Sequence, residues 1–357
     1  MRKEFFSSTI IDWYQANHRN LPWRKTIDPY KIWLSEVILQ QTRVAQGLPY
    51  YERFISSFPS VFDLAKAPEQ KVLRLWQGLG YYSRARNLHR CAKEVVEKFN
   101  GNFPNSFNEL IKLPGVGDYT AAAIASIAFR EPIAVVDGNV FRVLARVFGI
   151  ENDIASGEGK KYFFSLANEL IDKSRPDLFN QAVMEFGALH CLPKNPKCGE
   201  CIFFKSCEAN QRNLQTVLPV KSKKLKVKTR YFYYFILRNK NKVLMKQRTE
   251  KDIWRGLNDF YLIETKRNQK TETLLQKDTF LTRAELIKES RVYKHVLSHQ
   301  KLMVRFITVQ ARLTKKTETI IHKLGMKWFT KNQVEKIPKP ILIERYINEK
   351  IHKQDFW

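Results

Sequence analysis

Between residues 7 and 210, apolar side chains recur mainly at the three- and four-residue spacing that is typical of α-helices. Proline and glycine interrupt this pattern and divide it into short segments. The interrupting residues are Pro22, Pro29, Pro59, Gly78, Gly80, Pro104, Pro114, Gly138 and Pro176. The pattern predicts that this part of the chain is almost entirely α-helical.

The pattern changes beyond Pro219, where residues 221–230 contain six basic residues and no acidic residue. Such a segment is typical of a solvated linker that lies near a phosphate backbone. Residues 231–237 then read Tyr-Phe-Tyr-Tyr-Phe-Ile-Leu, which favours a strand, and a turn at 239–241 would lead to a second strand at 242–247. We therefore expect a mainly α catalytic region at 1–212, a basic linker at 213–228 and an α+β domain at 229–357.

Charge points to the partner of the chain. The 357 residues include 62 Lys and Arg against 35 Asp and Glu, which gives a formal net charge of +27, far more than solubility requires. Nucleic acid is the favoured polyanion, because no apolar run reaches the length of about 20 residues that a membrane-spanning helix needs. The amino terminus lacks the pattern of a signal peptide, so we expect a bacterial cytoplasmic, nucleoid-associated protein.

Four of the five cysteines lie close together in the sequence. They are Cys191, Cys198, Cys201 and Cys207, separated by six, two and five residues. Four thiolates at this density suit a tetrahedral zinc ion or an iron–sulphur cluster, and their chemistry leaves both open. Cys91 stands alone on a helical stretch and is expected in the core.

A Leu-Pro-Gly-Val-Gly sequence at 113–117 separates a helical run that begins near Ser106 from another at 119–128. Its glycines, Gly115 and Gly117, would let a ligand approach the backbone closely, and the first amides of the second helix would form an anion site. This arrangement fits a DNA phosphate, although a plain structural turn between two helices is the simpler alternative.

Two carboxyl groups are candidates for chemistry. Glu36 lies on a helix that Pro29 opens, where Glu36, Gln40 and Arg43 would share one face, or it is an ordinary surface carboxylate. Asp137 follows an apolar run at 133–136 and could be the N-cap of the next helix, a role that does not exclude catalysis.

Several segments occur in the order found in a known family. They are Leu-Pro-Trp-Arg at 21–24, Trp-Leu-Ser-Glu-Val-Ile-Leu-Gln-Gln-Thr at 33–42, Gly-Leu-Gly-Tyr-Tyr-Ser-Arg-Ala at 78–85, the hairpin at 113–117, Val-Asp-Gly-Asn-Val at 136–140 and the four cysteines. Over roughly the first 210 residues, the chain resembles the endonuclease III-like superfamily of DNA glycosylases, and in its details the MutY type.

The resemblance implies a six-helix barrel with a helix-hairpin-helix, packed against a helical subdomain in which the four cysteines hold a [4Fe–4S] cluster. It implies that Glu36 protonates the departing adenine at N7 and that Asp137 stabilises or traps the sugar, with Tyr119 and Asn139 assisting. Protonating the leaving base while an anion faces the sugar is the division of labour known from glycoside hydrolysis.

The resemblance also implies a set of DNA contacts. Adenine must be flipped out of the duplex before it can be attacked. Gln41 and Tyr81 match positions that wedge into the gap left by the flipped base. The expected DNA-binding residues are Arg24, Gln41, Tyr81, Gly115 and Gly117.

The region from about Thr229 resembles, more weakly, the Nudix-related domain that MutY enzymes use to recognise 8-oxoguanine. Trp-Arg-Gly-Leu at 254–257 and Leu-Ser-His at 297–299 carry this resemblance, although Leu297 replaces the usual aromatic residue. The glutamate-rich pyrophosphatase motif of Nudix enzymes is absent from the sequence. We expect Ser298 and His299 to recognise the lesion and His295 to be a plain surface residue.

The sequence thus favours a monomeric adenine DNA glycosylase of base excision repair, which hydrolyses the N-glycosidic bond of adenine opposite 8-oxoguanine or guanine in double-stranded DNA. One alternative is an endonuclease III-type pyrimidine glycosylase and lyase, which carries a lysine where this chain has Tyr119. Phe141 likewise supplies no amine. A second alternative, a non-enzymatic DNA-binding protein with a cluster, would have no use for Glu36 in a polar cleft.

Overall fold

The computed structural model describes residues 3–222, 227–282, 284–297, 299–310 and 314–351. The chain forms two compact units, one of Met1–Lys66 with Asn87–Lys223 and the other of Ala67–Arg86 with Lys224–Trp357. None of the helices in the described residues is both long and apolar enough to span a membrane.

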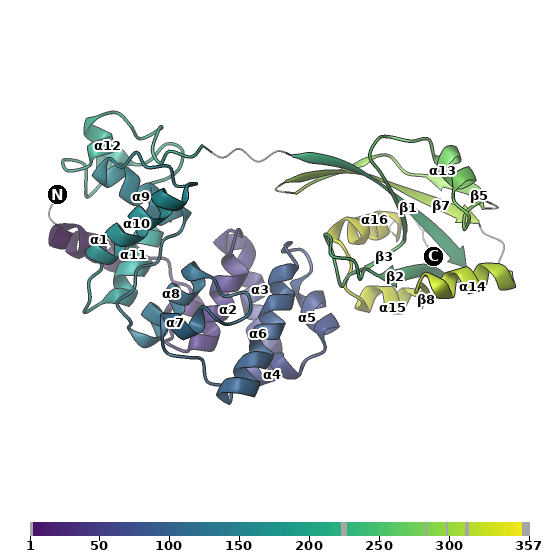
Figure 1. Cartoon of the computed structure of the whole chain (residues 1–357), viewed down its shortest axis with the longest axis horizontal. Coiled ribbons are helices and arrows are strands. Elements are labelled where there is room, and N and C mark those ends of the chain that lie inside the picture. Colours follow the sequence, from purple (N-terminus) through teal and green to yellow (C-terminus); the bar gives the residue numbers. More distant parts are fainter. Residues whose placement is uncertain (1–2, 223–226, 283, 298, 311–313, 352–357) are drawn as a thin grey trace. The chain divides into compact units, whose positions relative to one another are not determined.

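The described part of the first unit is helical, as predicted, and its helices run from purple to teal in Figure 1. The α-helices are α1 (Lys3–Asn17), α2 (Pro29–Leu39), α3 (Val44–Ser57), α4 (Val61–Lys66), α6 (Ser83–Phe99, whose first turn belongs to the second unit), α7 (Phe107–Leu110), α8 (Asp118–Phe129), α9 (Gly138–Phe148), α10 (Gly157–Leu170), α11 (Pro176–Leu189) and α12 (Glu208–Gln211). Two 3₁₀ turns, η1 (Pro22–Arg24) and η2 (Cys198–Glu200), complete the set.

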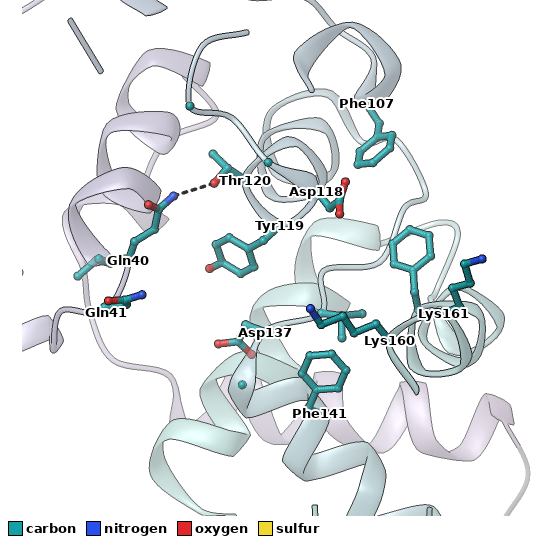
Figure 2. A pocket seen from close by; sticks show the side chains of 16 residues that line it. Gln40, Gln41, Phe107, Asp118, Tyr119, Thr120, Asp137, Phe141, Lys160 and Lys161 are labelled. Carbon is teal, nitrogen blue, oxygen red and sulfur yellow. Dashed lines mark hydrogen bonds between the residues drawn. The ribbon is translucent and has the colours of Figure 1, made fainter. Parts of the chain in front are cut away.

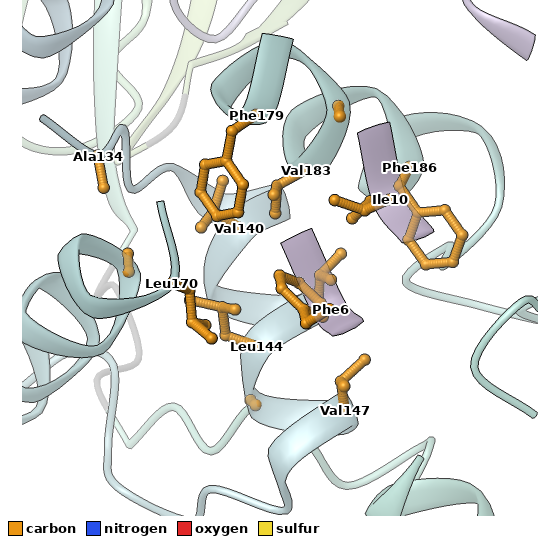
Figure 3. Close-up of a cluster of buried hydrophobic side chains, with 14 of the residues drawn as sticks. Phe6, Ile10, Ala134, Val140, Leu144, Val147, Leu170, Phe179, Val183 and Phe186 are labelled. Atoms are coloured by element: carbon orange, nitrogen blue, oxygen red, sulfur yellow. The ribbon is translucent and has the colours of Figure 1, made fainter. Parts of the chain in front are cut away.

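These helices pack in two groups. In one group α2 contacts α3 and α8, and α7 leads through the predicted hairpin into α8. In the other group α1 packs on α10 and α11, and α9 packs on α11 and α12. Figure 3 shows the second core, where Phe6 of α1 lies among Leu144 and Val147 of α9 and Val183 of α11.

The second unit combines a sheet with helices, which confirms the predicted α+β class. Its strands are β1 (Lys228–Asn239), β2 (Lys242–Gln247), β3 (Asn258–Asp259), β4 (Tyr261–Thr265), β5 (Glu285–Glu289), β6 (Tyr293–Val296), β7 (Gln300–Gln310) and β8 (Lys327–Thr330). Its helices are α5 (Glu69–Trp76), α13 (Thr271–Lys277), α14 (Lys315–Lys323), α15 (Lys331–Lys336) and α16 (Ile341–Ile351). Both strands that the sequence predicted are present as β1 and β2.

Strand β1 is the centre of the sheet, because it pairs in parallel with β7 and antiparallel with β2 and β4. Six consecutive residues, 232–237, are buried, so both faces of this strand are covered. On one face Tyr233 and Phe235 pack with residues of α13 and α14. On the other face Tyr234 stacks on Phe306 of β7, which in turn stacks on Tyr346 of α16.

The core around Phe6 gives a first prediction. Phe6 is fully buried and its ring centroid lies 5.1 Å from that of Phe203 and 5.4 Å from that of Phe148. We expect Phe6→Ala to lower the free energy of unfolding by about 3–5 kcal/mol, because it leaves a cavity. Phe5→Ala is the matched control, since Phe5 is 49% exposed. Denaturant unfolding that shows equal losses for the two variants would contradict this packing.

Candidate active site

Glu36 is held on a helix that is buried on nearly all sides. Asp28 caps α2 by accepting a hydrogen bond from the Tyr30 amide at 2.9 Å. Eight of the 11 residues of α2, Glu36 included, are buried. Glu36 is therefore not the surface carboxylate that the sequence allowed. The predicted polar stripe was also wrong, because the helix ends at Leu39 and the backbone turns away at Gln40 before it reaches Arg43.

Asp137 caps α9, as the sequence allowed. Its Oδ1 accepts hydrogen bonds from the amides of Asn139 and Val140, both at 2.8 Å, and its Oδ2 accepts one from the Asn139 side chain, also at 2.8 Å. These donors fix the carboxylate at the positive end of the helix dipole. Asp137 also lines a cavity, so its capping role does not exclude a role in chemistry.

This cavity, of about 960 Å³, brings together many of the residues that the sequence singled out. Its lining includes Gln41, Gly115, Gly117, Tyr119 and Asp137. In Figure 2 the side chains of Tyr119 and Asp137 approach the same space from α8 and from the start of α9. The hairpin thus lies at the same cavity as Tyr119 and Asp137.

The hairpin glycines have the conformations that the sequence argument required. Gly115 has a φ of +77°, in the left-handed region that favours glycine. Gly117 precedes the first turn of α8, and a Cβ there would meet no atom within 4 Å. The backbone beside Gly117 is consequently open to a ligand.

One hydrogen bond connects Glu36 to this cavity. The Tyr119 hydroxyl donates to Oε2 of Glu36 over 2.6 Å. Burial raises the pKa of Glu36 to about 7, with the charge of Asp137 adding to the effect and the Tyr119 hydrogen bond opposing it. Burial and the two neighbouring carboxylates raise the pKa of Tyr119 well above its usual value, so this hydroxyl keeps its proton and remains the donor.

Burial also raises the pKa of Asp137, but the amides of Val140 and Asn139 oppose that rise because they stabilise the anion. The environments of the two carboxyl groups therefore differ. Glu36 has a buried setting and one hydroxyl donor, whereas Asp137 accepts three N–H donors. Such a pair can hold one protonated acid and one anion at neutral pH.

A hydrogen-bonded chain links Asp137 to the cysteine loop. Asn139, which donates to Asp137, accepts from Nη2 of Arg142 at 2.9 Å, and Nε of Arg142 donates to the Cys191 carbonyl at 2.8 Å. Gly187 makes room for this chain, because a Cβ there would lie 2.6 Å from Cβ of Asn139. The sequence argument did not single out Arg142, since its partners Cys191 and Gly187 lie far along the chain.

Arg24 and Arg19 form an ion cluster with the buried side chain of Glu185. Nη2 of Arg19 and Nη2 of Arg24 lie 2.6 and 2.7 Å from Oε2 of Glu185. Burial opposes the ionisation of Glu185, but hydrogen bonds from Arg24 and Arg19 outweigh it and lower its pKa to about 2. The sequence argument missed Arg19 and Glu185, which no local pattern connects. A DNA contact of Arg24 stays a prediction.

Lys160 of α10 is a further cavity residue that the sequence argument missed. Lys160 and its neighbour Lys161 both line the cavity and are exposed. In Figure 2, Lys160 extends toward the side of the cavity that holds Asp137, whereas Lys161 points away. The cavity therefore contains an amine, although Tyr119 and Phe141 supply none.

The four cysteines of the loop line one small cavity together with Arg146. They form no disulfide. Arg146 donates to Sγ of Cys191 at 3.4 Å, and the Phe203 amide donates to Sγ of Cys201 at 3.4 Å, contacts that suit thiolates. Burial raises the pKa of Cys201 to about 12, and the neighbouring cysteines add to this rise. A bound cation would favour the thiolate form. Cys91 is fully buried, as predicted.

The remaining predicted residues belong to the second unit. Tyr81 and His299 line a separate cavity of about 450 Å³, and Ser298 lies outside the described residues. His295 is not the plain surface residue that we expected. It is half-buried, its ring centroid lies 5.8 Å from that of Trp254, and burial lowers its pKa.

A helical fold with a hairpin and Asp137 at one cavity, and with Glu36 hydrogen-bonded to the cavity residue Tyr119, is the arrangement of a DNA N-glycosylase, and comparisons with known proteins agree. Residues 34–172 match the family model of the HhH-GPD superfamily of base excision DNA repair proteins, and residues 233–349 match that of the NUDIX domain. A solved thermostable thymine-DNA glycosylase superposes with a TM-score of 0.54 at 31% identity, covering 59% of this chain and 97% of its own.

Known relatives identify the family within this superfamily. The adenine DNA glycosylase of Buchnera aphidicola subspecies Baizongia pistaciae is 35% identical over 351 residues, 96% of each chain. That of Rattus norvegicus is 46% identical over 216 residues, 58% of this chain and 42% of the rat protein. The chain belongs to the MutY-type adenine DNA glycosylases.

The pKa of Glu36 predicts the pH dependence of base excision. Because we expect the acid form of Glu36 to donate the proton, the single-turnover rate should fall as the pH rises through about 7. Glu36→Gln should bind duplex DNA like the wild type and lose about 10²–10⁴-fold in this rate. Rates measured from pH 5 to 9 check both points. A rate that stays constant across this range, or equal losses of binding and rate in Glu36→Gln, would exclude Glu36 as the acid.

Proposed function

We propose that this protein removes adenine that is mispaired with 8-oxoguanine or guanine in duplex DNA, by hydrolysing the N-glycosidic bond. The observation that carries the proposal is a pair of carboxyl groups. Asp137 lines the cavity and accepts three N–H donors, and Glu36, with a pKa of about 7, is hydrogen-bonded to the cavity residue Tyr119. Membership of the adenine DNA glycosylase family supports the choice of base.

In this proposal Glu36 is the general acid. The Tyr119 hydroxyl donates a hydrogen bond to Oε2 of Glu36. The transferable proton is therefore carried by the other oxygen, Oε1. Protonation of the adenine ring makes the base a neutral leaving group. The bond between the ring nitrogen and C1′ of the deoxyribose then breaks, and its electron pair stays with the base.

Asp137 acts on the sugar. The carboxylate stabilises the oxocarbenium-like cation at C1′, or bonds to it until water attacks. Its hydrogen bonds to Asn139 and Val140 hold it in place while this charge develops, so little reorganisation is required. Water adds at C1′ and loses a proton, which leaves an abasic site and free adenine.

The strand that carries the adenine needs contacts on both sides of the cavity. We assign one side to the open backbone of the hairpin at Gly115 and Gly117, and the other to the Lys160 ammonium. Gln41, which is exposed with a φ of +55°, and Tyr81 are proposed to wedge into the gap that the flipped base leaves.

The second unit is proposed to read the base opposite adenine. His299 is exposed and shares its cavity with Tyr81, which supports this role, and Ser298 is proposed from its sequence position. Oxidation of guanine creates a donor at N7 and an acceptor at C8, and one good contact to a base edge is worth about 1–3 kcal/mol.

A direct test of the proposed function uses three duplexes, with adenine opposite 8-oxoguanine, adenine opposite guanine, and an oxidised pyrimidine. Alkali then cuts the strand at abasic sites. We expect cleavage of the first two duplexes and none of the third. Removal of the oxidised pyrimidine without removal of adenine would replace this proposal with a pyrimidine glycosylase.

The same reaction without alkali tests whether the enzyme also cuts the strand, which requires an amine that captures the sugar. We expect intact abasic sites and little trapping by borohydride, because neither Tyr119 nor Phe141 supplies an amine that could capture the sugar. Efficient trapping that Lys160→Ala abolishes and Lys161→Ala preserves would instead assign a lyase activity to Lys160.

The four cysteines are proposed to hold a [4Fe–4S] cluster, which would brace the loop between α11 and α12. The two N–H donors to cysteine sulphur suit this group, although they would also suit zinc. Metal and sulphide analysis of the purified protein should find iron with sulphide and visible absorption. A colourless, zinc-loaded and active protein would contradict this assignment.

A further inference from the structure

The segment Ala67–Arg86 precedes most of the first unit in sequence but forms part of the second compact unit. It contains α5 and the turn at 77–82 that presents Tyr81. The sheet domain therefore has a helical extension, and this extension carries the residue proposed as a wedge.

The turn is held in a defined shape. Gly78, Gly80 and Tyr81 have φ values of +104°, +76° and +50°, and the Trp76 indole donates to the Gly80 carbonyl at 3.0 Å. A tyrosine in the left-handed region is strained, so its surroundings must maintain that conformation. The side chain of Tyr81 is presented to solvent and is 41% exposed.

Three residues, Gln77, Lys339 and Glu344, join this turn to the rest of the unit, and we refer to them as the latch. Gln77 ends α5, and its amide is used at both atoms, because Nε2 donates to Oε2 of Glu344 at 2.9 Å and Oε1 accepts from the Lys339 amide at 3.1 Å. The Lys339 ammonium, only 2% exposed, lies 2.8 Å from the same carboxylate oxygen. The ion pair of Lys339 and Glu344 thus orients the side-chain amide of Gln77.

A second contact holds the other side of α5. Gln70 donates to the Gly256 carbonyl at 3.1 Å, and a Cβ at Gly256 would lie 2.9 Å from Cδ1 of Leu73. Arg86 donates to the Arg255 carbonyl at 2.6 Å. The turn at 254–256 follows β2 and contributes Trp254 to the same cavity as Tyr81 and His299.

We propose that the latch holds the Tyr81 wedge against the domain that reads the opposite base. Gln77 is then a positioning residue for adenine extrusion. This inference rests on the proposed wedge role of Tyr81. Because this domain sets the position of the wedge, it couples recognition of the opposite base to flipping of the adenine. Its sheet takes no part in the chemical step.

The test uses the full-length protein and duplexes in which 2-aminopurine replaces adenine opposite 8-oxoguanine, because its fluorescence rises when the base leaves the stack. Gln77→Leu, which keeps the volume and removes both hydrogen bonds, should slow extrusion by about tenfold. Gln77→Glu should be worse, because it places a second carboxylate beside Glu344.

Combining Gln77→Glu with Glu344→Gln exchanges the amide and the carboxylate, and should restore extrusion to within about twofold of the wild type. In a Tyr81→Ala background, Gln77→Leu should cause no further loss, because both changes act on the same wedge. Thermal midpoints of all variants show whether they fold, and the pH profile set by Glu36 should not move.

The inference is overturned if Gln77→Leu extrudes like the wild type while Tyr81→Ala is impaired. It is also overturned if the two losses multiply in the double variant, or if the exchanged pair folds but stays slow, since both results indicate a merely structural role. Normal extrusion by Tyr81→Ala would instead remove the wedge role of Tyr81 from the proposed function. Comparing Tyr81→Ala with the wild type distinguishes this result from a failure of the latch alone.

Discussion

Burial of a carboxyl group favours its protonated form, and the proposed chemistry depends on Glu36 being such a group. The sequence provides this setting by placing Glu36 on a helix that is buried on nearly all sides, and by supplying the Tyr119 hydroxyl as its hydrogen-bond donor. Arg24 lowers the pKa of Glu36, but by less than the Tyr119 hydrogen bond does. Glu185 shares a bidentate ion pair with Arg24, so much of that positive charge is already neutralised. The ion cluster therefore helps to preserve the acid.

The anion of the pair depends on a different part of the fold. The first turn of α9 holds Asp137 in position. Asn139 connects Asp137 by hydrogen bonds to Arg142, which in turn bonds to the start of the cysteine loop. Arg146, one turn further along α9, donates to Sγ of Cys191 and to the Leu218 carbonyl. A change in the position of the cysteine loop would consequently reach Asp137 through two side chains, Arg142 and Asn139. The loop thus supports the position of this carboxylate.

Local pattern was sufficient for much of this structure and failed where contacts are distant in sequence. The N-cap at Asp137, the hairpin glycines, the two strands at 231–237 and 242–247 and the core position of Cys91 follow from short-range rules, and all are confirmed. The stripe from Glu36 to Arg43 failed because one backbone turn at Gln40 ended the helix, which its composition does not signal. Glu185 with Arg19, Lys160 in the cavity and the packing of His295 on Trp254 join residues that only the tertiary fold brings together.

The central claim is that Glu36 is the carboxyl group that carries the acidic proton near neutral pH. Carbon-13 labelling of the glutamate side-chain carboxyls allows each to be titrated by NMR, and the signal missing from Glu36→Gln identifies Glu36. We predict that this signal titrates with a pKa of about 7, and that Tyr119→Phe moves it upward because a hydrogen bond to the anion is lost. A Glu36 carboxyl that titrates near the ordinary value of about 4.3 would contradict the account, because the site would then have no acid at neutral pH.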